Sequence, residues 1–416
     1  MAAPGENLRI NGDRLWDSLM EMAKIGPGVA GGNNRQTLTD EDAEGRALFQ
    51  KWCEEAGCTM GLDTMGNMFA QRDGTDPDAL PVYVGSHLDT QPTGGKYDGV
   101  LGVLGGLEII RTLNDLGIKT KHPIVVTNWT NEEGSRFSPA MVCSGVFAGV
   151  FELDYALQLA DANGFTMGDE LERIGYTGPH PVGGRDIRAS FELHIEQGPL
   201  LELSQMSIGV VTGVQGARWY NVRIEGEATH AGPTPMGQRR DPVRGAARVL
   251  DRLFVIVREY DEEARLAVGE IRTHPGSRNT VPGHVDFTVD LRHPVDSALA
   301  DLDAELRALV AEVSAEMDVE GRVEQIWHSP TVHFEAECID AVRAAAARLG
   351  YDHMDVFSGA GHDSVYLQRI CPTAMIFVPC EGGISHAESE SITSVDAEAG
   401  ANVLLRATLE LAGFGS

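Results

Sequence analysis

The sequence is poor in cysteine, and the cysteines that it has follow no metal-binding or redox spacing. Six occur in 416 residues, without a C-x-x-C pair: Cys53, Cys58, Cys143, Cys338, Cys371 and Cys380. A secreted disulfide scaffold is short and dense in cysteine, which this chain is not. We therefore interpret the six residues as reduced thiols and expect a cytoplasmic protein.

Positive charge is also scarce. The chain has 33 Lys and Arg residues against 62 Asp and Glu residues, which gives a formal net charge of −29 at pH 7. Nucleic acid and anionic membranes bind proteins through a cationic surface. The charge balance argues against both as partners and favours a protein that acts on small molecules.

Long apolar runs, repeats and low-complexity tracts are absent from the sequence. No stretch approaches the roughly 18 apolar residues that cross a bilayer. The first residues, MAAPGENLRINGDRLWDSL, contain no basic segment followed by an apolar run, so we expect no signal peptide. A hydrophobic content of 42% is typical of a globular protein, and the length suffices for two or three domains.

Strands and helices alternate through both ends of the chain. The patterns predict strands at 67–71, 82–86, 123–129, 189–193 and 373–378, and helices at 11–25, 40–55, 100–116, 336–349 and 396–411. Such alternation is typical of an α/β fold in which a mostly parallel sheet is sandwiched by helices.

The middle of the chain follows a different pattern. It predicts strands at 218–225, 266–273, 284–292 and 322–327, with helices at 242–260 and 297–317. The resulting order, β-α-β-β-α-β, is that of a ferredoxin-like α+β unit. We therefore divide the chain into one domain formed by residues 1–212 and 330–416, and a second domain, 213–329, inserted into it.

Residues 81–103 contain the first candidate site. A short apolar strand ends in Gly-Ser-His-Leu-Asp-Thr, and a glycine-rich loop leads from there into a helix. In open α/β sheets this junction lies at the carboxyl end of the strand, where ligands bind. His87 and Asp98 offer a nitrogen and an oxygen ligand suited to zinc-like metals. Asp89 is expected to orient the imidazole of His87 from behind.

Four polar loops follow four predicted strands. Together they supply the side chains His87, Asp98, Glu132, Glu133, His194 and His386. If the strands share one sheet edge, these side chains converge into a site for two divalent ions. We assign His87 and His194 to one ion and Glu133 and His386 to the other, with Asp98 bridging both.

Glu132 remains free in this assignment and is the candidate general base, which takes a proton from water and returns it to the leaving nitrogen. Each piece taken alone has a simpler explanation. A Glu-Glu pair is common at the solvated start of a helix, and a histidine at a strand end or in a loop needs no metal. Only the joint arrangement at strand-to-loop junctions makes the prediction specific.

At these residues the chain resembles the dinuclear-metal aminoacylase/carboxypeptidase superfamily. Within it, the chain is similar to the branch that hydrolyses N-carbamoyl amino acids, β-ureidopropionate and allantoate. The resemblance covers nearly the whole chain. The matching motifs are GSHLDT (85–90), GGKYDGVLGV (94–103), TNEEGSRF (130–137), HIEQGP (194–199), GEATHAGPTPM (226–236), RNTVPG (278–283), DLRHP (290–294), SGAGHDS (358–364) and ISHAESE (384–390).

The resemblance implies a metal-binding domain and a smaller lid domain through which the protein forms a homodimer. It implies that His230 stabilises the oxyanion, in its own or in the partner subunit's site, and that Arg292 and Asn279 hold the substrate carboxylate. An arginine fork is suited to that task because it binds both carboxylate oxygens. Further candidates for substrate contact are Gln215, Gln197, Ser358, Gly359 and Ala360.

The activity implied is hydrolysis of an N-carbamoyl-L-amino acid to the free amino acid, ammonia and carbon dioxide. It would require two divalent ions per subunit, with zinc, manganese, cobalt and nickel all compatible with the ligands. Trp219 stands where an allantoate hydrolase is expected to have a further arginine, although Arg218 keeps allantoate open as a substrate. The same scaffold would also suit a β-ureidopropionase, an acyl-amino acid deacylase, a dipeptidase or a non-catalytic binding protein.

Overall fold

The computed structural model describes residues 8–414, which form two compact units. Unit 1 consists of residues 1–212 and 333–416, and unit 2 of residues 213–332. Residues 1–7, on which part of the signal-peptide prediction rests, and residues 415 and 416 lie outside the described range. No helix in the described range is long and apolar enough to cross a membrane.

A nine-stranded sheet forms the centre of unit 1. Its main path is β1-β2-β4-β3-β5-β16-β6-β14, and β15 pairs with β6. The strands are β1 (Thr59–Leu62), β2 (Met68–Arg72), β3 (Val82–His87), β4 (Ile124–Trp129), β5 (Ala189–Ile195), β6 (Ile208–Val214), β14 (Val332–His333), β15 (His353–Ser358) and β16 (Thr373–Val378). The four central strands, β4, β3, β5 and β16, are parallel, whereas β2 and β6 flank them in antiparallel pairing. The predicted mostly parallel α/β fold is confirmed.

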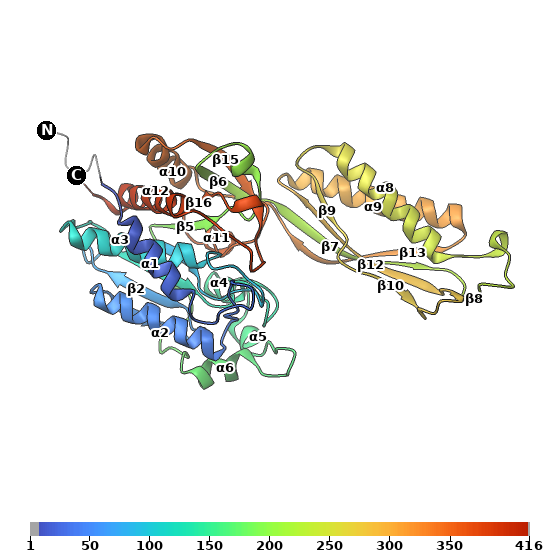
Figure 1. The fold of residues 1–416 in the computed structure, drawn as a ribbon, viewed down its shortest axis with the longest axis horizontal. Helices are drawn as coiled ribbons and strands as arrows, with labels where there is room; N and C mark the ends of the chain where they lie inside the picture. The colour runs from blue at the N-terminus through green and yellow to red at the C-terminus, as the bar shows by residue number, and fades with distance from the viewer. Residues whose placement is uncertain (1–7, 415–416) are drawn as a thin grey trace. The chain divides into compact units, whose positions relative to one another are not determined.

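Every residue of the four central strands is buried. Strands covered on both faces read as continuous apolar runs, which explains why the sequence showed them clearly. Helices pack against the sheet and against one another (Figure 1): α1 (Gly12–Met22), α3 (Val100–Asp115), α10 (Ala336–Leu349) and α12 (Ser394–Ala412) form one connected group, while α4 (Val142–Phe147) and α11 (Ser364–Leu367) contribute to a separate apolar cluster. The sheet is thus held between two layers, with its strand ends free to form a site.

Short helices and capped ends complete unit 1. Thr39 and Thr393 cap α2 (Asp40–Glu55) and α12 by accepting main-chain N–H bonds. The remaining helices are α5 (Leu153–Leu157), α6 (Met167–Ile174), α7 (Leu200–Leu203) and the 3₁₀ turn η2 (Glu381–Gly383).

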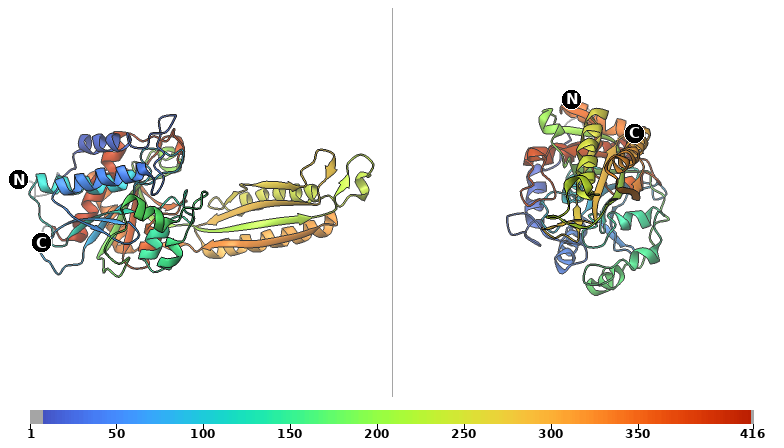
Figure 2. Two further views of the ribbon diagram at one scale, coloured as in Figure 1. Left: turned by 90° about the horizontal axis from the view of Figure 1, so that it is seen from below. Right: turned by 90° about the vertical axis from the view of Figure 1, so that its right-hand side faces the viewer.

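Unit 2 contains a five-stranded antiparallel sheet, with main path β10-β12-β7-β13 and β9 paired to β12. Its elements are β7 (Gly216–Glu225), α8 (Pro242–Tyr260), β9 (Arg265–Ala267), β10 (Ile271–His274), β12 (His284–His293), α9 (Asp296–Met317) and β13 (Glu320–Ser329). Helices α8 and α9 cover one face, and Figure 2 shows the long strands side by side. The predicted ferredoxin-like order is present, with the expected strand at 266–273 divided into β9 and β10.

A second, two-stranded ribbon lies beyond one end of this sheet. It joins β8 (Thr229–His230) to β11 (Thr280–Val281) in antiparallel pairing, and the 3₁₀ turn η1 (Met236–Gln238) follows β8 along the chain. Strands of two residues are too short to produce an alternating pattern, so the sequence did not predict them.

Candidate active site

The four polar loops meet at one edge of the sheet in unit 1. They follow β4, β3, β5 and β16, which are parallel neighbours in that order. Parallel neighbours present their carboxyl ends on the same side, so polar residues widely separated in sequence become adjacent. The predicted convergence depends on this topology.

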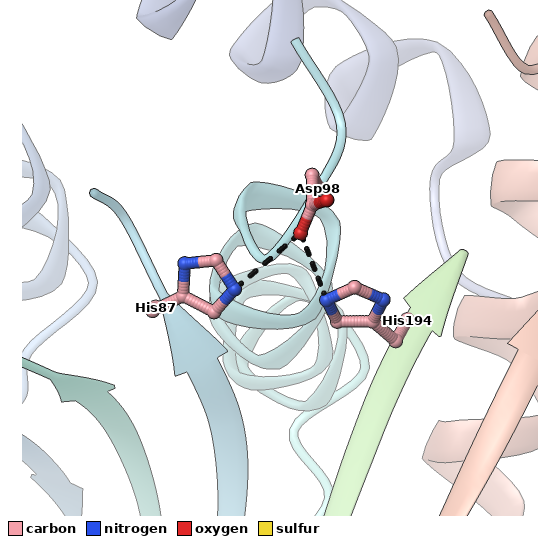
Figure 3. A group of neighbouring side chains, drawn as sticks. All are labelled: His87, Asp98 and His194. Carbon is pink, nitrogen blue, oxygen red and sulfur yellow. Dashed lines mark ion pairs between the residues drawn. The ribbon is translucent and has the colours of Figure 1, made fainter. Parts of the chain in front are cut away.

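Asp98 lies between the histidines of β3 and β5 (Figure 3). Its Oδ1 is 3.5 Å from Nε2 of His87 and 3.1 Å from Nε2 of His194. All three side chains are buried. Burial alone would raise the pKa of Asp98, but the imidazoles of His194 and His87 hold it well below its usual range.

Gly99 makes room for this arrangement. Its φ of +68° lies in the left-handed region, and a Cβ there would collide with the imidazole of His87. Its main-chain N–H also donates to Nε2 of His194 at 3.2 Å. Helix α3 begins at the next residue, so its positive end faces the carboxylates of the site.

The other oxygen of Asp98 faces a second group. Oδ2 lies 3.6 Å from Nε2 of His386, which in turn lies 3.4 Å from Oε2 of Glu133. The two groups, His87–Asp98–His194 and Asp98–Glu133–His386, each have their ligand atoms within 4.8 Å of one another. Asp98 therefore belongs to both groups through different oxygens, as a bridging carboxylate would.

Main-chain carbonyls orient the two buried histidines. Nδ1 of His87 lies 2.9 Å from the carbonyl oxygen of Asp89, and Nδ1 of His194 lies 2.9 Å from that of Ile195. A carbonyl accepts only, so in the neutral ring each Nδ1 carries the proton and each Nε2 presents a lone pair. This is the tautomer required of a metal ligand.

The carboxylate of Asp89 does not orient His87 but binds the turn that carries Glu132 and Glu133. It accepts hydrogen bonds from the Thr37 hydroxyl at 2.6 Å and from the main-chain N–H groups of Glu132 and Glu133 at 3.4 and 3.3 Å. We expected Asp89 to orient His87; in the structure its main chain does so, while its carboxylate holds the turn that carries the two glutamates.

Glu132 is buried beside the first group. Its Oε2 lies 3.5 Å from Nε2 of His87. Burial raises the pKa of Glu132 well above its usual range, and the nearby acids Asp363, Glu133 and Asp98 raise it further against the opposing effect of His87. A carboxyl that lies beside metal-ligand candidates and outside both ligand groups is placed to accept and return a proton.

The residues fit a pair of divalent ions. Nε2 of His87 is buried and has no hydrogen-bond partner among residues 8–414. Although burial lowers the pKa of His87, Glu132, Asp98 and Asp89 raise it well above its usual value, and burial with adjacent acids also raises the pKa of Glu133. The cluster contains more acidic groups than basic ones, and divalent cations would neutralise this excess of buried negative charge.

Two further side chains support this cluster and were not predicted. Glu390 accepts main-chain N–H bonds from Tyr97 and Asp98 at 3.2 and 3.1 Å, and burial raises its pKa to about 7. Ser385 donates to Oδ2 of Asp98 at 3.0 Å. Both lie in the motif that contains His386, and only their position next to that histidine could have indicated them.

The remaining candidates of unit 1 lie close by. The amide of Gln197 donates to Oδ2 of Asp98 at 2.8 Å, which places it on the ligand cluster. Ser358 is buried, and its hydroxyl bonds to the carbonyl of Ala360 at 2.9 Å and pairs with Nε2 of His362 at 3.0 Å, while Gly359 between them is exposed. The imidazole of His362 packs edge-on against His194, with ring centroids 4.6 Å apart.

Unit 2 brings together only some of its candidates. His230 and Asn279 are adjacent, because the main-chain N–H of Ala231 donates to the carbonyl of Asn279 at 2.9 Å. Gln215 lies between β6 and β7, half-buried. Arg292 forms an ion pair with Asp290 at 2.8 Å near the end of β12.

The positions of His230 and Arg292 in unit 2 are far apart. Arg292 lies opposite Ala217, whereas the ribbon with His230 adjoins the other end of β12, which begins at His284. Eight residues separate the two ends, or about 26 Å at the rise of a strand. Figure 1 places β8 beyond that far end of the sheet.

Known proteins resemble this chain over its whole length. The model of Peptidase family M20/M25/M40 matches residues 83–410. The N-carbamoyl-L-amino-acid amidohydrolase of Rhizobium meliloti is 56% identical over 412 residues, covering 99% of both chains. The allantoate amidohydrolase of Bacillus subtilis is 31% identical and covers 96% of this chain and 97% of its own.

A solved structure agrees with both comparisons. The hydantoinase/carbamoylase family amidase of Burkholderia multivorans superimposes with a TM-score of 0.94 at 56% identity, covering 97% of this chain and 98% of its own. The sequence match, the relatives and the shared fold lead to one conclusion. The chain belongs to Peptidase family M20/M25/M40.

Proposed function

We propose that the protein is a metal-dependent hydrolase that converts N-carbamoyl-L-amino acids to the free L-amino acid, ammonia and carbon dioxide. The observation that carries the proposal is the position of Asp98, whose two carboxylate oxygens face two different groups of candidate ligands. Glu132 lies beside the first group and is not assigned to either ion. The high identity to a carbamoyl amino acid amidohydrolase supports this substrate class. Six buried, unpaired cysteines agree with a cytoplasmic location.

His87 and His194 would hold one ion, Glu133 and His386 the other, and Asp98 both. When bound, the ions would lower the pKa of a water molecule and polarise the carbamoyl carbonyl. Zinc, manganese, cobalt and nickel all accept such ligands. Glu132 would take the proton from that water and deliver it to the departing nitrogen, because it lies beside His87 and is not assigned to either ion.

His230 is proposed to donate a hydrogen bond to the developing oxyanion. Its Nδ1 accepts the main-chain N–H of Gly232 at 3.1 Å. The neutral ring then carries its proton on Nε2, which is a donor, and the ring is exposed. Gly232 thus selects the tautomer that the proposed role requires.

Arg292 and Asn279 are proposed to hold the substrate carboxylate, with Gln215, Gln197 and residues 358–360 as further contacts. Because the ribbon of His230 and Asn279 adjoins the His284 end of β12, and Arg292 lies about 26 Å along that strand, one copy of unit 2 cannot bring all three to one small substrate. We infer that two subunits contribute to each site, His230 and Asn279 coming from one and Arg292 from the other. The homodimer would form through unit 2, the proposed lid, in which β13 pairs only with β7 among the described strands and leaves its other edge available.

The orientation of Arg218 favours a carbamoyl amino acid over allantoate. Adjacent residues of a strand point to opposite faces. Arg218 is paired in register with buried Leu291 and forms an ion pair with Asp303 of α9 at 3.4 Å, on the helical face. It therefore does not join Arg292, and Trp219 on the other face packs against Trp327 with ring centroids 4.6 Å apart.

Ammonia release by metal-stripped protein reloaded with single metals tests the proposal. The substrates are N-carbamoyl-L-methionine, its D-isomer, N-carbamoyl-β-alanine and allantoate. We expect metal-dependent turnover of the L-isomer, and loss of most turnover in Glu132→Gln with metal binding retained. Preference for allantoate or the β-alanine derivative would reject the substrate assignment, and near-normal kcat in Glu132→Gln would reject that residue as the base.

A further inference from the structure

The loop that carries His386 is fastened to an N-terminal loop through one carboxylate. Glu388 accepts main-chain N–H bonds from Val29 at 3.2 Å, from Gly32 at 3.1 Å and from Ala30. Successive N–H groups that point into one concavity form an anion-binding nest. The occupant of this nest is a side chain of the protein itself, two residues from a proposed metal ligand.

The nest loop is in turn bound to the loop that precedes Asp98. Asn33 and Gly94 exchange two main-chain hydrogen bonds of 2.9 Å, and Gly28 donates to the carbonyl of Gly32 at 2.8 Å to close the turn. Glycines permit the close approach, since a Cβ on Gly32 would lie 2.8 Å from Cβ of Glu388. Glu388 therefore connects the His386 loop to a segment already fixed beside the ligand cluster.

His386 needs such external support more than the other histidines do. Carbonyls hold Nδ1 of His87 and of His194, but Nδ1 of His386 has no hydrogen-bond partner among residues 8–414. Its side chain is 51% exposed, against 1% for each of the other two. Its φ of +54° is also a left-handed conformation that its loop must maintain.

We propose that Glu388 is a positioning residue for the second metal ion: by occupying the nest of residues 28–32 it fixes the loop that presents His386 to Glu133 and Asp98. This inference rests on the proposed function, because it presupposes two ions. Binding of the second ion should depend on the contact between Glu388 and the nest, whereas binding of the first should not. The first, between His87 and His194, is held by buried strand ends and does not need Glu388.

The test is a titration of the metal-stripped full-length protein with Co²⁺, followed by calorimetry and by the visible spectrum of each bound equivalent. Wild type should bind two equivalents. In Glu388→Ala the first should be unchanged and the second weakened by at least about tenfold, as for other residues that support metal ligands. Gly28→Ala should have the same effect, since its Cβ would displace the end of the Glu388 side chain.

Two variants complete the comparison. Glu381→Ala removes an exposed acid from the same loop and should leave both equivalents unchanged, which separates positioning from charge. His386→Ala should lose the second equivalent and identify its spectrum. Two unchanged equivalents in Glu388→Ala, or equal weakening of both, would overturn the role of Glu388 alone. A wild type that binds fewer than two would overturn the two-ion proposal and this inference with it.

Discussion

His87 is held by the main chain of Asp89 and not by its carboxylate. Nδ1 of His87 lies 2.9 Å from the carbonyl oxygen of Asp89 but 3.8 Å from Oδ1. Asp89 therefore has two separate roles. Its main-chain carbonyl orients a proposed metal ligand, and its carboxylate accepts hydrogen bonds from the turn that carries Glu132 and Glu133. Substitution of the side chain should disturb only the second.

Asp89→Asn tests this division. The single amide oxygen can accept fewer of the N–H groups of Glu132 and Glu133, while the carbonyl that orients His87 remains. We expect kcat to fall about 10- to 100-fold with the first metal ion retained. Steady-state kinetics and metal analysis measure this, and Thr37→Val, which removes one donor to Asp89, should have a smaller effect. Selective loss of the first ion would show that the carboxylate serves His87 after all.

Removal of the ions should destabilise the fold. Without them, Asp98, Glu132 and Glu133 are buried together, and burial with like charges already raises the pKa of both glutamates. Ligands that bind only the native state stabilise it, so chelation should lower Tm by about 10 °C and abolish activity. Differential scanning calorimetry with and without chelator measures the shift.

Asp98→Asn is the control for chelation, because it lacks the shared ligand. Its Tm should respond little to chelator, and divalent metal should restore wild type but not the variant. An equal response in both proteins would mean that the stabilising ions bind elsewhere.

The convergence of the site could be predicted from the sequence because it follows from strand order. The proposed ligands lie at the ends of four buried strands or in the loops that follow them, and such strands are parallel neighbours in an α/β sheet. The supports of the ligands could not be predicted. Glu388 and Glu390 act through main-chain N–H groups of residues almost 300 or more positions away, and neither pairing leaves a local pattern.

Unit 2 shows the same limit at a larger scale. Motifs in the sequence indicate His230, Asn279 and Arg292, but they do not show how far apart these residues lie in the fold. Only the register of β12 with β7 reveals that Arg292 and the His230 ribbon occupy opposite ends of the sheet. The divided strand at β9 and β10 was also missed, because a strand pattern does not show where pairing stops.

Asp63 should make stability depend on pH. Its carboxylate accepts from the main chain and side chain of Asn67, whose Oδ1 accepts the N–H of Thr130 at the start of the Glu132 turn. Burial raises the pKa of Asp63 from 3.8 to about 6. Between these values the native state binds a proton that the unfolded state does not, so this contribution to stability grows as pH falls from 6 to 4 and is lost as pH rises through 6.

Asp63→Asn isolates that contribution. The unfolding free energy of wild type minus that of the variant should increase by about 2.5 kcal/mol between pH 7 and pH 4, since each pKa unit corresponds to about 1.4 kcal/mol and the unfolded carboxyl is itself partly protonated at pH 4. Denaturant unfolding at a series of pH values gives the difference, with exposed Asp78→Asn as the control. A difference that stays constant with pH would contradict the raised pKa.

Mixed dimers test whether two subunits build each site. Glu132→Gln and His230→Ala should each be inactive alone. If His230 acts in the partner's site, a heterodimer has one site with both Glu132 and His230 intact. Random exchange of equal amounts should then restore roughly a quarter of wild-type activity, because half of the dimers are mixed and one of their two sites works.

A site built within one subunit predicts no recovery, because each chain of the mixture carries a defect in its own site. The matched control pairs Glu132→Gln with His194→Ala, both of which lie in unit 1. These two defects can never be separated by exchanging unit 2, so this mixture should stay inactive under either arrangement. Recovery in the first mixture alone therefore means that His230 acts in the partner subunit's site. Recovery in neither mixture means that His230 acts in the site of its own subunit. Arg292 of that subunit would then not belong to the same site, because one small substrate cannot reach both ends of β12.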